Sequence, residues 1–293
     1  MSYKTPPEIA RAGITSGAAK AAMSWDKSLV AGFLAGAYIA FAGLLAIVAS
    51  AGMDPKIWGG VQTVVTGGVF ALGLILVVVA GSELLTGNMA LVPLAALNRR
   101  VSIGRMSFSM FFVLIGNLLG SLFVAYFLAK ETGVVTAAAP LARLDKIATA
   151  KAITESDWQI FLRAVGCNWL VCLAVWMALG AEDVAGKVLA IFFPIMAFVA
   201  MGFDHVVANM FFLPTAIFAH APGIDWGNTL NNWLFAFLGN FVGAGIFVAT
   251  TYWYLYVRGT PDDAAAEVRA GAPDEITAGD GSGRFGTPVR RGA

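Results

Sequence analysis

Long apolar runs separated by short polar turns dominate the chain, and they predict six membrane-spanning segments. A helix needs about 20 mainly apolar residues to cross a hydrocarbon core of about 30 Å, and every run is at least that long. Four runs are uninterrupted, and two carry a polar break in their interior. The uninterrupted runs are residues 29–51, 106–129, 158–179 and 230–257, and the interrupted ones are 58–97 and 188–218.

The two interruptions repeat one another, because residues 81–93 can be laid over 202–214 without a gap. This duplication predicts an all-α polytopic membrane protein with an inverted 3+3 repeat, about 28–129 and 158–257, in which helices 2 and 5 are broken. A break inside a span is tolerated only where its backbone lines a cavity. The matching pairs are Gly81 with Gly202, Glu83 with Asp204, Asn88 with Asn209, Met89 with Met210, and Pro93 with Pro214.

Polar segments flank this predicted membrane domain of residues 28–257. Residues 1–27 show a loosely helical spacing of apolar positions, which indicates an amphipathic helix at the membrane surface. Residues 258–293 are rich in glycine, proline, alanine and acids, so we expect a disordered tail. Lysine and arginine are more frequent on the side of both flanks, so the positive-inside rule predicts that both termini are cytoplasmic.

Composition supports a membrane protein and narrows its chemistry. Hydrophobic residues make up 58% of the chain and charged residues 13%, with a mean hydropathy of +0.76. A net charge of +1 gives no indication of nucleic-acid binding. The two cysteines, Cys167 and Cys172, share one apolar span without a histidine or acid at ligand spacing, so we predict neither a metal site nor a disulfide, and no cofactor.

The breaks place ionisable side chains where hydrocarbon is expected. Such a group costs roughly 2.5 to 3.5 kcal/mol or more inside a span, so we interpret His205 as a functional residue. Thr86 lies at the matching break and offers a hydroxyl partner. We expect Glu83 and Asp204 to cap the half-helices that follow the breaks, satisfying backbone N–H groups that lipid cannot.

Two half-helix N-termini aimed at the membrane midplane favour an anion, since each carries roughly half a positive charge. Asn88 and Asn209 occupy equivalent repeat positions and fit two interpretations equally well: contacts between helices or contacts with a substrate.

Three segments, SELLTGN, NWLVCLAVW and FDHVVANM, resemble signatures of the formate/nitrite transporter family. The resemblance extends over residues from about 10 to 258. It implies six spans with the second and fifth broken, an aquaporin-like architecture, and a homopentamer with one pore in each protomer. It also implies small monovalent weak-acid anions as substrates, chiefly formate, nitrite and hydrosulfide.

The resemblance assigns expected roles residue by residue. His205 matches the central pore histidine, and Thr86 matches the threonine that hydrogen-bonds it. Lys151 resembles a vestibule lysine that attracts anions. The remaining matches are Phe70, Leu84 and Phe198 to the apolar constrictions, and Asn168 and Asn209 to asparagines along the pore.

We therefore expect a channel or proton-coupled facilitator for these anions, not an enzyme, in which protonation assisted by His205 removes the charge that makes crossing costly. One alternative is an aquaporin-like channel for neutral solutes, but neither break contains an Asn-Pro-Ala repeat. A less favoured alternative is an intramembrane redox subunit, which usually requires axial histidines on facing helices. The chain has only two histidines, and the second, His220, is poorly placed.

Overall fold

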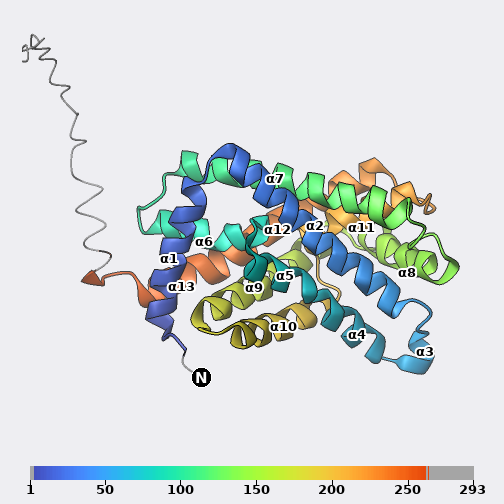
Figure 1. Cartoon of the computed structure of the whole chain (residues 1–293), viewed down its shortest axis with the longest axis horizontal. Coiled ribbons are helices and arrows are strands. Elements are labelled where there is room, and N and C mark those ends of the chain that lie inside the picture. Colours follow the sequence, from blue (N-terminus) through green and yellow to red (C-terminus); the bar gives the residue numbers. More distant parts are fainter. Residues whose placement is uncertain (1–2, 262, 264–293) are drawn as a thin grey trace, which may run out of the picture.

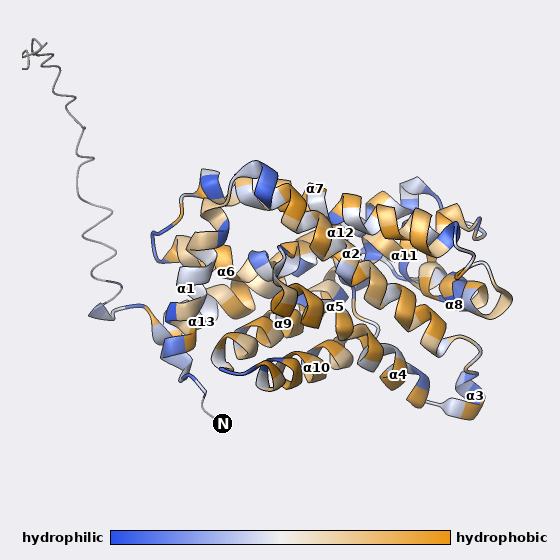
Figure 2. Cartoon of the chain, viewed as in Figure 1, coloured by the Kyte–Doolittle hydropathy of each residue, from blue (hydrophilic) through white to orange (hydrophobic). Residues whose placement is uncertain are grey.

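The computed structural model describes residues 3–261 and 263, and over this range it is a bundle of helices without a β-strand (Figure 1). The expected disordered tail lies almost entirely outside the described residues. In Figure 2 the orange of hydrophobic residues covers most of each long helix, as the sequence predicts for membrane-spanning segments.

Within the described residues, five helical segments are long and apolar enough to cross a membrane. Two are single helices, α2 (Trp25–Ser50) and α9 (Asp157–Gly180). The other three join α-helical and π-helical turns end to end. They are α4 (Val61–Phe70), α5 (Leu72–Leu76) and η1 (Val77–Gly81); α7 (Ile103–Phe123) and η2 (Val124–Lys130); and α12 (Trp226–Ala244), η4 (Gly245–Thr250) and α13 (Thr251–Tyr256).

The second and fifth spans are broken, as predicted. After η1, the chain runs through Ser82 and Leu84 in extended conformation and resumes as α6 (Leu85–Leu97). The fifth span consists of α10 (Val184–Ala200) and α11 (Val206–Phe218), which are separated by a similar loop. Gly81 and Gly202 have φ angles of +83° and +72°, a conformation that glycine adopts without the strain of a Cβ atom, so equivalent glycines turn the chain at both breaks.

Glycines let the outer helices of each half pack at very short range. A Cβ atom added at Gly120 of α7 would lie 2.0 Å from the carbonyl oxygen of Phe33 in α2. In the second half, a Cβ atom at Gly243 of α12 would lie 2.3 Å from the carbonyl oxygen of Val165 in α9. Small residues permit such close backbone contacts between membrane helices, and the two halves use them at corresponding places.

Shorter helices close the two ends of the bundle (Figure 1). At one end lies α1 (Pro6–Ala22), and Gly17 in α1 packs so closely on α6 that an added Cβ atom would be 1.9 Å from the carbonyl oxygen of Leu91. At the other end lie α3 (Pro55–Trp58), α8 (Ala138–Thr149) and η3 (Ala150–Thr154). The predicted N-terminal helix therefore exists, and it packs against α6, the half-helix that follows the break in the second span.

Candidate functional site: a pathway through the two broken helices

Thr86 and His205 meet in the centre of the bundle. Thr86 lies in the first turn of α6, and His205 is the N-cap residue of α11. The Oγ1 atom of Thr86 lies 2.8 Å from Nε2 of His205, and the two residues are buried with exposed fractions of 0% and 2%. Folding thus joins the two matching breaks through one polar contact.

The second nitrogen of the imidazole fixes how this contact is made. The backbone N–H of Ala208 donates to Nδ1 of His205 over 3.1 Å, so Nδ1 acts as an acceptor and carries no proton. Neutral imidazole then bears its proton on Nε2, which donates to the Thr86 hydroxyl oxygen. The hydrogen-bond network therefore selects the neutral tautomer that presents a donor to the centre of the molecule.

Apolar side chains close the space around His205. A cavity of only about 10 Å³ remains there, and Phe70, Leu84 and Phe198 line it together with His205. The Phe198 ring lies 5.9 Å from the His205 ring, and Phe70 meets Phe198 edge-on with ring centroids 6.0 Å apart. One water molecule needs a cavity of roughly this volume, so the contact lies in a nearly dry constriction.

Two asparagines from neighbouring helices hold the break loops. Oδ1 of Asn117 accepts from the backbone N–H of Leu85, and its Nδ2 donates to the carbonyl oxygens of Gly32 and Glu83. Asn240 makes the equivalent set: it accepts from the N–H of Val206 and donates to the carbonyl oxygens of Ala164 and Asp204. The two halves therefore satisfy the polar backbone of their breaks in the same way.

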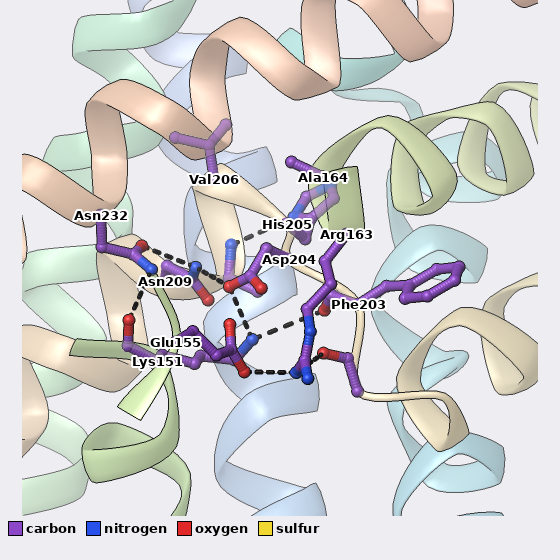
Figure 3. A network of polar contacts seen from close by, with 12 residues as sticks. Lys151, Glu155, Arg163, Ala164, Phe203, Asp204, His205, Val206, Asn209 and Asn232 are labelled. Carbon is purple, nitrogen blue, oxygen red and sulfur yellow. Dashed lines mark hydrogen bonds and ion pairs between the residues drawn. The ribbon is translucent and has the colours of Figure 1, made fainter. Parts of the chain in front are cut away.

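Two larger cavities that contain charged side chains lie on either side of the constriction. The one beside α8, which we call the α8 vestibule, has a volume of about 230 Å³ and contains Lys151. Nζ of Lys151 lies 2.8 Å from Oδ1 of Asp204, and Asn209 donates to the same oxygen over 2.8 Å (Figure 3). Arg163 forms an ion pair with Glu155 at the edge of this network.

The cavity beside α1, the α1 vestibule, repeats this arrangement. Its volume is about 400 Å³, and it contains Lys20, Glu83 and Asn88. Nζ of Lys20 lies 2.8 Å from Oε1 of Glu83, while Asn88 donates to Oε2 over 2.8 Å. A lysine, an acid and an asparagine thus occupy equivalent places on both sides of His205.

Comparison with known proteins identifies this architecture. The profile described as formate/nitrite transporter matches residues 7–254. The chain belongs to the formate/nitrite transporter family.

Relatives and solved structures agree with the family profile. A probable formate transporter of Methanothermobacter thermautotrophicus is 45% identical over 272 residues, which cover 88% of this chain and 98% of the relative. A solved FNT family ion channel superposes with a TM-score of 0.77 at 32% identity, covering 85% of this chain and 98% of the other. A pentameric formate channel with formate bound gives a TM-score of 0.70 at 30% identity, covering 80% and 98%. The chain is thus a multi-pass membrane protein of a transporter and channel family, not of an enzyme family.

The structure corrects the expected role of Glu83 and Asp204. Neither residue caps a half-helix, because the N-cap positions are Leu84 and His205 and the first backbone N–H groups bind Asn117 and Asn240. The acids instead point to lysines across the vestibules. A charged lysine compensates a buried carboxylate better than a backbone N–H group does, and neutral amides from adjacent helices serve the backbone.

The three asparagines that the sequence predicted in the pathway have different hydrogen-bond partners. Asn168 donates to the carbonyl oxygens of Thr86 and Asn240, so it links helices behind the constriction. Asn88 and Asn209 hold the vestibule acids, and Asn209 also donates to Asn232, so both have protein partners that match the inter-helix interpretation.

Several site residues were not predicted. Asn117 and Asn240 occur in the repeated GN-x-x-G motif, so the duplication itself contained a signal for them. Lys20 and Glu155 gave no comparable signal, because tertiary packing alone brings them to the vestibules.

Among the described residues no cluster of three or more histidine, cysteine or acidic side chains could hold a metal ion, and Cys167 and Cys172 are buried free thiols.

Proposed function

We propose that this protein transports small monovalent weak-acid anions, formate or nitrite first and hydrosulfide as a further candidate, through a pore in each protomer. One observation carries the proposal: a dry constriction at His205 lies between two vestibules with an excess of basic side chains. The names of the relatives, a probable formate transporter and a formate channel, support the choice of substrate.

The vestibules favour anions by charge. The α8 vestibule is lined by Arg143, Lys146, Lys151 and Arg163 against the single acid Glu155, with Asp204 directly behind Lys151. The α1 vestibule is lined by Lys20 and Lys187 against Glu83. A cleft with an excess of one charge raises the local concentration of ions of the opposite charge.

The constriction opposes the bare anion. An unpaired ion that leaves water for apolar surroundings pays a large desolvation cost, whereas the neutral acid pays little. His205 presents its Nε2–H at this point, and the Thr86 hydroxyl lies beside it. Passage in the protonated form, with the imidazole hydrogen-bonded to the permeating species, is the mechanism that these surroundings favour.

The assembly and orientation that we propose follow from the same features. The exposed apolar faces of the bundle suit lipid and neighbouring subunits, and the pentameric formate channel supports a homopentamer. Basic residues around α1 and the loop before α7 favour a cytoplasmic location for that end and for both termini, in the cell inner membrane.

Uptake into proteoliposomes tests this function. Radiolabelled formate, nitrite and hydrosulfide should enter vesicles that contain the purified protein, faster when an inward proton gradient is imposed. Osmotic swelling in glycerol, measured in parallel, tests the neutral-solute alternative. Glycerol flux without anion uptake would contradict the proposed function.

A further inference from the structure

Glu155 of the α8 vestibule forms a carboxyl pair with Asp204, which lies behind the vestibule wall. The Asp204 side chain is 0% exposed and the Glu155 side chain 6%. One oxygen of each is occupied: Oδ1 of Asp204 accepts from Lys151 and Asn209, and Oε1 of Glu155 pairs with Arg163. The other two oxygens, Oδ2 of Asp204 and Oε2 of Glu155, are buried and have no donor among the described residues.

The two carboxyl groups lie within hydrogen-bonding reach of one another (Figure 3). Two ionised carboxylates repel each other and cannot form a hydrogen bond, whereas one proton between them satisfies both free oxygens. We infer that Glu155 and Asp204 together bind one proton at the entrance of the transport pathway, and that this proton and a small anion bind to the α8 vestibule cooperatively.

Charged groups surround the pair from η3, α8 and α9. Lys151 contacts it from η3 and Arg163 from α9, while Arg143 and Lys146 of α8 and the neutral His205 line the same cavity. Burial and the neighbouring Asp204 raise the pKa of Glu155 to about 8, against the opposing effect of Lys151 and Arg163. The pair therefore holds its proton at neutral pH and loses it above about pH 8.

Charge couples the proton to the anion, and this coupling rests on the proposed anion transport. With the proton bound, the vestibule carries one more positive charge than without it, so an anion binds more tightly. Linkage requires the converse, so a bound anion raises the affinity of the pair for its proton. Apparent anion affinity should therefore fall as pH rises through the pKa of Glu155.

Infrared spectroscopy detects the proton without any transport measurement. A protonated carboxyl group has a C=O stretching band that ionised carboxylates lack and that shifts in D₂O. In the purified protein in lipid, this band should disappear as pH rises through about 8. Glu155→Gln should abolish it, because the amide donates to Asp204 permanently. The control Glu131→Gln alters an exposed glutamate paired with Lys130 and should leave the band unchanged.

Uptake as a function of pH tests the coupling. In wild type and Glu131→Gln, the half-saturating formate concentration should rise by about fivefold or more across the transition, the lower end of ordinary coupling between sites. Glu155→Gln should remove this dependence while uptake persists. A wild-type protein without the titrating band overturns the proton site, even if anions are transported. A titrating band without uptake of any anion leaves the proton site intact and contradicts the proposed function instead.

Discussion

Thr86 and His205 are 119 residues apart in the chain, yet their side chains meet at 2.8 Å between the two broken helices. Each residue lies beside a glycine-containing break, and the breaks belong to different halves of an inverted repeat. The contact therefore lies at the point where the repeats face each other, in the constriction between the two vestibules. Little water fits into the adjoining cavity of about 10 Å³, and among the described residues only Thr86 accepts from Nε2–H of His205, which strengthens this hydrogen bond.

Thr86→Val should test that contact. Valine matches the shape of threonine but leaves the Nε2–H of His205 without an acceptor, which costs about 1–3 kcal/mol for a buried polar group. We expect a lower melting temperature and slower formate uptake. Thr86→Ser retains the hydroxyl and should behave as wild type in both measurements. Equal uptake by Thr86→Val and Thr86→Ser would show that the hydroxyl has no part in transport.

Lys151→Ala should weaken anion attraction and also destabilise the protein. It removes a cation from the α8 vestibule and leaves the buried Asp204 carboxylate with Asn209 but without a cationic partner, a loss of about 3–5 kcal/mol for a buried ion pair. The half-saturating anion concentration should rise, and its salt dependence should weaken because screening acts on charge steering.

The double variant Lys151→Ala/Asp204→Asn separates the two effects. Replacing the Asp204 carboxylate, which has lost its cationic partner, with a neutral amide should recover most of the thermal stability without restoring anion affinity. Recovery of both would mean that Lys151 serves only to neutralise Asp204.

Asn117→Ala and Asn240→Ala should destabilise the breaks to a similar degree. Each removes an acceptor from one buried backbone N–H and a donor from two carbonyl oxygens, so each should cost at least the roughly 1–3 kcal/mol of one unsatisfied buried group. Melting temperatures in detergent measure the effect. Asn231→Ala removes an exposed hydrogen bond to Asp157 and serves as the control, with little expected change. A strong loss for only one of Asn117 and Asn240 would contradict their equivalence.

The sequence predicted those parts of the fold that depend on local pattern. Run length predicted the spans, and glycine with polar residues inside apolar runs predicted both breaks. The gap-free match between the breaks also predicted that the two breaks face one another, and Thr86 and His205 lie in different breaks. The overlay itself pairs Thr86 with Val207 and His205 with Leu84.

Tertiary packing determines the side-chain contacts that the sequence did not predict. The expected capping by Glu83 and Asp204 was wrong because Asn117 and Asn240 reach the same backbone groups from neighbouring helices. Lys20 lies 63 residues from Glu83 and meets it only because α1 docks on α6. Glu155 precedes its span in a polar stretch that is typical of an exposed turn, and only the folded loop buries its side chain beside Asp204.

Formate uptake by the His205→Asn variant under a proton gradient is the most direct test of proton-assisted transport through His205. Asparagine keeps a polar side chain at the constriction but does not titrate, and removal of an expensive group from a membrane interior should leave the assembly folded. The measurement is labelled formate uptake into proteoliposomes with and without an inward proton gradient, beside wild type and His205→Phe. We predict gradient-driven uptake in wild type, a gradient-independent leak in His205→Asn, and no uptake in His205→Phe. Uptake by His205→Asn with the pH dependence of wild type would contradict the role of His205 in proton-assisted transport.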